Sequence, residues 1–175
     1  MVPVVPRGMP PCATKNVKKI EERVAQLEHG VSGPVDHQQM VAAADDLAFL
    51  ACEDGCGPYI RERGAIPLLV SLLDSHWPVK LQSHAARAIG NLAYGSPDNR
   101  TEIAKAGGIE ALAAITLEIK SKEKPIENAL FALVNVIFTN GANRQTLCNC
   151  LPGCVQKVRD LAEHGTAAQR EYAGL

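Results

Sequence analysis

Short, almost entirely apolar runs alternate along the chain with longer segments in which apolar residues recur every three or four positions. One such run, GAIPLLVSLL at 64–73, carries a proline near its start, followed by leucines. Proline is tolerated in the first turn of a helix but is awkward in a central strand, and leucine favours helix. The run GGIEALAAITL at 107–117 has the same character. Both runs predict buried helices that are apolar on nearly all sides.

The pattern recurs at a nearly constant interval. Gly64 and Gly107 lie 43 positions apart. The segment AARAIGNLA at 85–93 aligns with AADDLAFLA at 43–51 at a shift of 42, and with NALFALVNVI at 128–137 at a shift of 44. A shift of 42 to 44 residues that persists through three units is an internal repeat.

Each complete unit reads as a short helix, a buried helix and a long helix. The clearest unit places them at 58–63, 65–73 and about 79–94, and the next unit at 98–105, 108–121 and about 124–139. Gly64 suits the end of a first helix, because glycine adopts positive φ at little cost. Further helices are expected at 16–29, 36–52, 143–150 and 154–164, with the opening of another long helix at 166–175.

These units resemble the armadillo repeat. The resemblance is carried by GAIPLLVSLL, followed about a dozen residues later by AARAIGNLAYGSPDNRTEIAKAGGIEAL, and it spans about residues 35–165 in three to four repeats. It implies an all-α fold, a right-handed α–α superhelix (armadillo-repeat solenoid) whose long third helices line a concave groove. The first unit departs most from the family pattern, with Phe49 where the others have asparagine and Asp45 followed by a second aspartate.

The expected organisation is a proline-rich, disordered tail at 1–15 and an armadillo-repeat domain at 16–175. The units of that domain are expected at about 16–56, 57–97 and 98–141, with a partial unit at 142–175. Because the last unit stops within a helix and solenoids need polar caps, a fragment of a longer array is expected.

Composition narrows the function classes. A net charge of −1 without a basic patch argues against nucleic-acid binding, and no apolar run is long enough for a membrane span. We expect a cytoplasmic or nuclear protein. Neither a nucleophile constellation nor a P-loop nor a dinucleotide fingerprint occurs, so no enzyme and no cofactor are expected. The six cysteines are Cys12, Cys52, Cys56, Cys148, Cys150 and Cys154.

The last three cysteines form C-x-C-x3-C, which raises a zinc hypothesis. Zinc takes four ligands, usually as two close pairs, and Cys52 and Cys56 would lie about two repeats away. We therefore expect no metal site. The cysteines are interpreted instead as small buried hydrophobes in a reducing cytosol.

In armadillo proteins that bind extended peptides, an asparagine on each third helix holds the peptide backbone. The resemblance implies this role for Asn91 and Asn135, whose amides both donate and accept hydrogen bonds. The alternative is that both asparagines bond neighbouring helix backbone. The remaining groove candidates lie on the same helix faces or at the matching positions of the first unit: Arg87, Phe131, His84, Asp45 and Phe49.

Nuclear-import adaptors carry tryptophan one turn before the asparagine, where this chain has Asp45, Arg87 and Phe131. Arg87 would repel a basic ligand, and with His84 it predicts an acidic partner segment, to which Phe131 adds an apolar surface.

The sequence thus predicts a non-catalytic protein-interaction module that binds a protein or peptide segment in its groove. Two alternatives stay open. One is the substrate-binding part of a multidomain ubiquitin ligase. The other is a scaffold for cytoskeletal, axonemal or vacuolar assembly, which would use its convex face or associate end to end.

Overall fold

The computed structural model describes residues 12–118 and 124–150, with Gly153, Gln156, Asp160, Glu163, His164 and Ala167. Within this part the chain forms α-helices and no strands, as predicted for an all-α fold. The helices are α1 (Thr14–Ser32), α2 (His37–Leu50), α3 (Cys56–Glu62), α4 (Ala65–Ser71), α5 (Val79–Ala93), α6 (Pro97–Lys105), α7 (Gly108–Glu118), α8 (Lys124–Ile137) and α9 (Gly141–Cys150).

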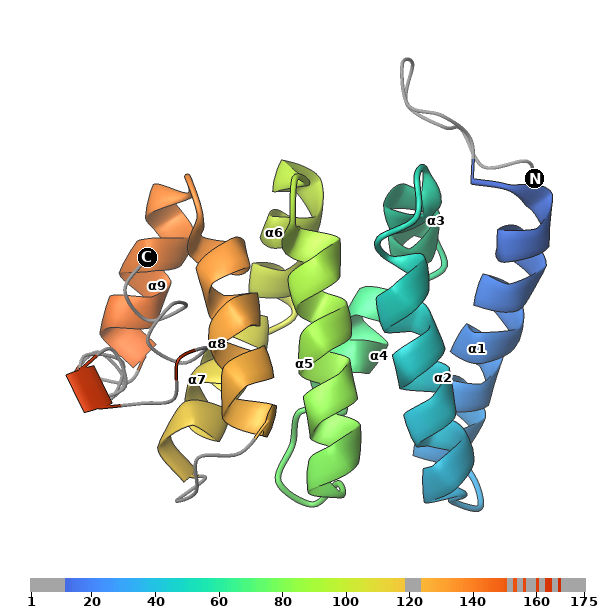
Figure 1. Cartoon of the computed structure of the whole chain (residues 1–175), viewed down its shortest axis with the longest axis horizontal. Helices are drawn as coiled ribbons and strands as arrows, with labels where there is room; N and C mark the ends of the chain where they lie inside the picture. Colours follow the sequence, from blue (N-terminus) through green and yellow to red (C-terminus); the bar gives the residue numbers. More distant parts are fainter. Residues whose placement is uncertain are drawn as a thin grey trace.

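The helices stack along one axis as a solenoid. In Figure 1 the long helices α2, α5 and α8 stand in a row, and the shorter α4 and α7 lie behind them. Helix α5 packs against α2 on one side and against α8 on the other. The right-handed armadillo solenoid predicted from the repeats is therefore confirmed.

Two glycines set the corner between the first and second helices of successive units. Gly64 has φ 73° and Gly107 has φ 80°, both in the left-handed region that favours glycine. Other helices begin with a polar N-cap residue. At the start of α2, Asp36 accepts hydrogen bonds from the amides of Gln38 and Gln39. The corner predicted at Gly64 is thus confirmed and recurs one unit later.

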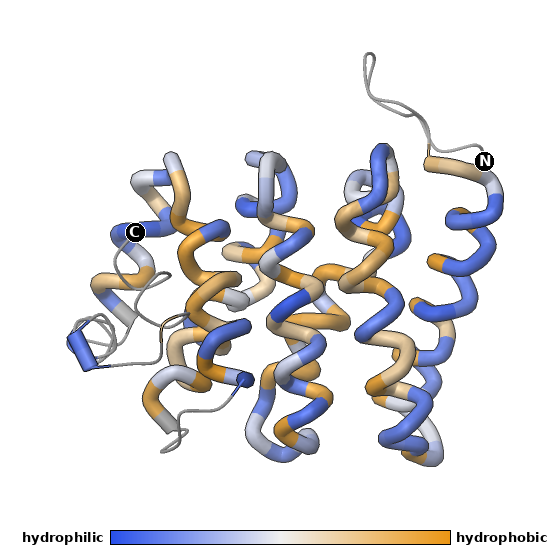
Figure 2. Tube along the Cα trace, in the orientation of Figure 1, coloured by the Kyte–Doolittle hydropathy of each residue, from blue (hydrophilic) through white to orange (hydrophobic). Residues whose placement is uncertain are grey.

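Aliphatic side chains form the core between the helices. The apolar positions that recur every three or four residues along α5 are all buried, with exposed fractions of 2% or less: Leu81, Ala85, Ala88, Ile89 and Leu92. In Figure 2 the terminal helix α1 is largely hydrophilic, whereas α8 carries long hydrophobic stretches. This difference fits their positions, because α8 packs against both α5 and α7.

Several helix ends differ from prediction. Helix α1 passes through Gly30 and ends at Ser32, whereas the helix was expected to end at residue 29. A Cβ on Gly30 would lie 2.6 Å from Sδ of Met40 on α2, so a larger residue there would have to displace the Met40 side chain. Helix α1 also begins at Thr14, inside the predicted tail. The rest of the tail up to residue 11 and most of the elements predicted at 154–164 and 166–175 lie outside the described residues.

No helix among the described residues is long and apolar enough to cross a membrane.

Asp46 on α2 joins α1 to the rest of the solenoid. Its carboxylate accepts from Lys19 Nζ at 2.8 Å and from Arg23 Nε at 2.6 Å, both on α1. Burial raises the pKa of Asp46, but the hydrogen bonds from Lys19 and Arg23 outweigh it, so the net pKa is lowered. A lowered folded-state pKa stabilises the protein above the unfolded-state pKa, and this stabilisation is lost as pH falls through the folded-state value.

Replacing Asp46 with asparagine is therefore expected to lower the free energy of unfolding by about 1–2 kcal/mol at pH 7. Urea unfolding at several pH values measures it, and the difference from wild type should shrink as the carboxylate protonates. Glu22→Gln is the control, since Glu22 makes only an exposed 4.0 Å pair with Lys18. Equal effects of the two substitutions would contradict the role given to Asp46.

Candidate functional site

The two predicted groove asparagines connect successive third helices. Asn91 on α5 donates from Nδ2 to the carbonyl oxygen of Ala48 on α2 at 2.7 Å, and Asn135 on α8 donates to that of Gly90 on α5 at 3.1 Å. Both asparagines thus bond the backbone of a neighbouring helix, which was the alternative to peptide binding. This bonding uses one hydrogen of each amide, and among the described residues neither Oδ1 accepts a hydrogen bond. Both side chains are half-buried, so each keeps an acceptor for a partner.

The predicted basic positions of the groove are paired with an acid. Arg87 on α5 donates to Asp45 on α2, and Nδ1 of His84 lies 2.9 Å from the same carboxylate. Nδ1 of His84 is buried and makes no hydrogen bond within the described part of the chain. Burial lowers the pKa of His84 more than Asp45 raises it. His84 is therefore neutral at neutral pH, and the charge of Arg87 is compensated.

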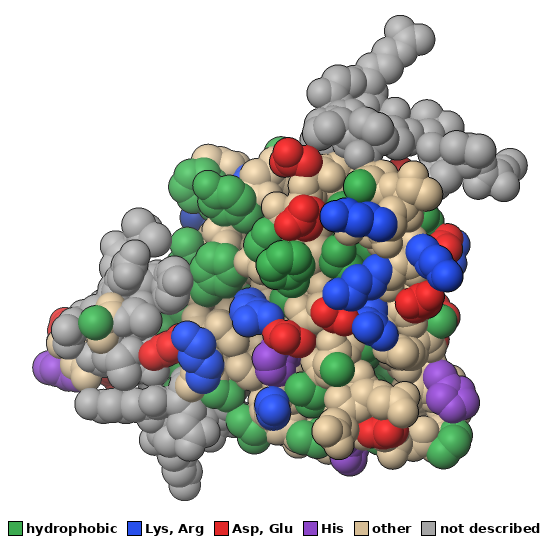
Figure 3. All heavy atoms as spheres, turned by 45° about the vertical axis from the view of Figure 1, so that its right-hand side comes forward, with side chains coloured by type: hydrophobic (Ala, Val, Ile, Leu, Met, Phe, Trp, Pro, Cys, Tyr) green, Lys and Arg blue, Asp and Glu red, His purple; other side chains and the backbone are tan. Residues whose placement is uncertain are grey.

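Oppositely charged side chains lie next to one another over this face, with hydrophobic side chains gathered beside them (Figure 3). The expectation of an acidic partner rested on the positive charges of Arg87 and His84. Arg87 is paired with Asp45 and His84 is neutral, so neither position offers an uncompensated positive charge.

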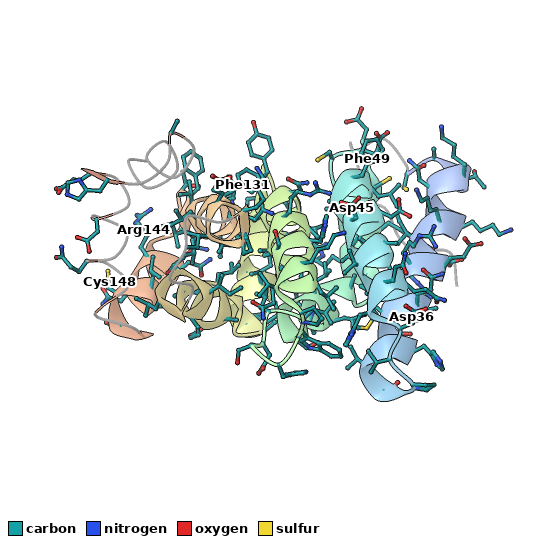
Figure 4. All side chains as sticks on the ribbon, turned by 60° about the horizontal axis from the view of Figure 1, so that its bottom comes forward. Asp36, Asp45, Phe49, Phe131, Arg144 and Cys148 are labelled. Atoms are coloured by element: carbon teal, nitrogen blue, oxygen red, sulfur yellow. The ribbon has the colours of Figure 1, made fainter. Side chains whose placement is uncertain are left out.

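The two predicted groove phenylalanines lie differently. Phe49, near the end of α2, is 65% exposed (Figure 4). Phe131 on α8 is half-buried and leans over α5 at Gly90, where a Cβ would lie 2.5 Å from its ring. The missing side chain of Gly90 therefore makes room for the Phe131 ring between the two helices.

A cleft of about 570 Å³ opens where α2 and α5 end. It brings together two of the predicted residues, Asn91 and Phe131, and leaves out Asn135, Arg87, His84, Asp45 and Phe49. Its other walls come from the turn after α2 and the last turn of α5, through Cys52, Glu53, Asp54 and Tyr94.

The cleft is lined by both acidic and aromatic residues. Glu53 and Asp54 are exposed and form no ion pair within the described part of the chain. Helix α2 also ends here, and helix C-termini carry partial negative charge. Tyr94 is 76% exposed. Sequence reasoning missed these residues, although Glu53 and Asp54 stand beside the glycine-rich turn that separates two units.

Among the described residues, no group of three or more His, Cys, Asp or Glu side chains could hold a metal ion. The C-x-C-x3-C hypothesis stays untested, because Cys154 and the side chain of Cys150 lie outside the described residues.

Comparisons with known proteins bear on this geometry. The family model described as Armadillo/beta-catenin-like repeat matches residues 58–94. No curated protein matches the sequence. A crystal structure of an engineered protein is similar at 26% identity and a TM-score of 0.76, covering 88% of this chain and 59% of its own. The chain thus spans about three fifths of that protein.

Two designed proteins share the fold. One, computationally designed for modular peptide recognition, has 23% identity and a TM-score of 0.75, with 93% of this chain and 67% of that chain covered. The other, solved in complex with the peptide (KR)4, has 23% identity and a TM-score of 0.74, with coverages of 91% and 66%. The matched repeat falls on the clearest predicted unit, so residues 58–94 are similar to an armadillo/beta-catenin-like repeat, and the chain shares the solenoid fold of the designed armadillo proteins.

Proposed function

We propose that this domain is a non-catalytic protein-interaction module that holds an extended partner segment across α2, α5 and α8. The observation that carries the proposal is the cleft between the ends of α2 and α5, which combines an amide, aromatic side chains and unpaired acids. Armadillo solenoids are built for such binding, and one similar designed protein was made for peptide recognition. We place the module in the cytosol or nucleus.

Asn91 supplies the contact to the partner's main chain. Its Oδ1 can accept from a peptide N–H, while the bond from its Nδ2 to Ala48 fixes the side chain in place. A side chain held in one orientation loses little entropy when a partner binds. Tyr94 and Phe131 provide an apolar wall for a side chain of the same segment.

Charge selects the partner. Glu53, Asp54 and the C-terminus of α2 favour a cation in the cleft. A lysine or arginine there would place its stem against Tyr94 and its charge near the two acids, with a further cation–π contribution. We therefore propose a partner segment that is basic, in place of the acidic segment expected from Arg87 and His84.

Binding of fluorescein-labelled (KR)4 and (ED)4 peptides, followed by anisotropy, tests this proposal. We expect the basic peptide to bind, with an affinity that falls as salt rises. Tyr94→Ser, and separately Glu53→Gln with Asp54→Asn, should each weaken binding by about three- to tenfold. Both changes lie at exposed positions, so the melting temperature should stay as in wild type.

Val79→Ser is the matched control, because Val79 is an exposed apolar residue at the opposite end of α5. It should leave the affinity unchanged. Preferential binding of (ED)4, or equal affinity in wild type and the cleft variants, would overturn the proposed partner chemistry.

A further inference from the structure

Two cysteines that are distant in sequence meet at the N-terminal end of the solenoid. Cys12 lies just before α1, and Cys56 is the first residue of α3. Their Sγ atoms are 2.7 Å apart, closer than the usual contact distance of non-bonded heavy atoms, about 3.5–4.0 Å. Both thiols are free in this structure. Neither residue lines the cleft, so the proposed function leaves this pair unexplained.

The environment holds the two sulfurs together. Cys56 is fully buried, and Asn16 on the first turn of α1 donates from Nδ2 to its Sγ at 3.6 Å. Cys12 is half-buried, so one of the two thiols stays within reach of a reagent. The exposed Cys52 is the rival partner for Cys56, but its thiol points to the carbonyl of Ala48 at 3.7 Å.

We propose that Cys12 and Cys56 are a reversible oxidation site and form an intramolecular disulfide when a small-molecule disulfide such as oxidised glutathione is present. The Cys12 thiolate attacks one sulfur of the reagent, and a glutathione thiolate leaves. The Cys56 thiolate then attacks the Cys12 sulfur of the mixed disulfide, and the second glutathione leaves. The two cysteine protons end on the two glutathione thiols, so one disulfide is reduced as another forms.

Proximity decides the second step. With the two sulfurs already in contact, attack within the protein outcompetes a second glutathione from solution. Burial, with the hydrogen bond and charge of Cys56, raises the pKa of Cys12 to about 12. Because the thiolate is the attacking species, formation should be slow at neutral pH and faster as pH rises.

The crosslink would fasten α1 to α3 and close a loop that contains all of α1 and α2. Closing a loop of this length restricts the unfolded chain, and the melting temperature should rise by about 10 °C. Oxidation would thereby stabilise the packing of α1 on the end of the solenoid.

The test uses the full chain, incubated at pH 8.5 with oxidised glutathione and quenched with acid. The intact mass should fall by two hydrogen atoms. Trypsin alone leaves Cys52 and Cys56 together in 24–61, so a second cleavage after Glu53 is needed to separate them. The expected product is 8–15 linked to 54–61.

Cys12→Ser should abolish both the linked peptide and the gain in melting temperature, and Cys52→Ser should keep both. Because the gain of each variant is measured against its own reduced form, a change in folding of one variant does not obscure the result. A link between Cys52 and Cys56, a disulfide between two copies of the chain, or stable glutathione adducts with Cys56 still a thiol would each overturn the proposal.

Discussion

Replacing Trp77 with alanine is expected to lower the free energy of unfolding by about 3–5 kcal/mol. Trp77 lies in the turn between α4 and α5, but its side chain is only 8% exposed. The indole Nε1 donates to the carbonyl of Ser71 at 3.1 Å, and the ring lies 6.1 Å from that of His37, edge to face. The Trp77 carbonyl accepts from Gln82 Nε2 at 2.9 Å. Removing the ring leaves a cavity and removes the hydrogen bond from the indole to the Ser71 carbonyl.

Urea unfolding followed by far-ultraviolet circular dichroism measures the loss, because the variant lacks the chain's single tryptophan. Trp77→Phe keeps an aromatic ring but leaves the Ser71 carbonyl without its donor, and it should cost about 1–2 kcal/mol. Tyr94→Ala is the exposed aromatic control and should stay within about 0.5 kcal/mol of wild type. A Trp77→Ala effect no larger than that of Tyr94→Ala would show that the turn contributes little to stability.

Arg100→Met is expected to have the second large effect, lowering the free energy of unfolding by about 2–4 kcal/mol. The guanidinium is buried at the C-terminal ends of α5 and α8. Its Nε donates to the Ala93 carbonyl at 3.0 Å, and its Nη1 donates to the Phe138 carbonyl and to Thr139 Oγ1, both at 3.1 Å. The charge also lies 5.6 Å from the centre of the Phe138 ring. Methionine keeps the apolar stem and leaves these acceptors without a donor.

The repeat supplies a matched control for Arg100. Arg144 stands 44 positions later at the same place in the next unit, yet it is exposed, and among the described residues it makes one long bond, 3.4 Å, to the Ile137 carbonyl. Arg144→Met should therefore cost less than about 1 kcal/mol. If chemical denaturation gave both variants the same midpoint, a buried anchoring role for Arg100 would be excluded.

The repeat interval and the residues that start and end the helices could be predicted because they depend on local chemistry. The backbone preferences of Gly64 and Pro67 do not depend on the rest of the fold. The sequence alone therefore predicted the helices and the turn between them. The end of α1 did not follow, because Gly30 lies inside that helix, where its missing side chain leaves room for Met40 from α2. That contact is tertiary, and no local pattern reports it.

The candidate site followed from the sequence only in part. The period indicated that Asn91 and Asn135 share a face, but not that each amide would donate to the preceding helix. Asp45 and Arg87 are 42 positions apart, so matching positions in adjacent units could have predicted their pairing. The cleft was missed because it is formed by the turn after α2, and such turns carry no periodic signal.

The side-chain bonds that join α2 to α5 and α5 to α8 have nearly the same sequence separation. Asp45 with Arg87, Ala48 with Asn91, and Gly90 with Asn135 lie 42, 43 and 45 positions apart. Joining two units thus closes a segment of only one repeat, whichever pair forms first. Loop-closure entropy rises slowly with length and is the same at each junction. Folding can therefore start at any junction and spread to its neighbours, and the rate should depend little on how many repeats are stacked.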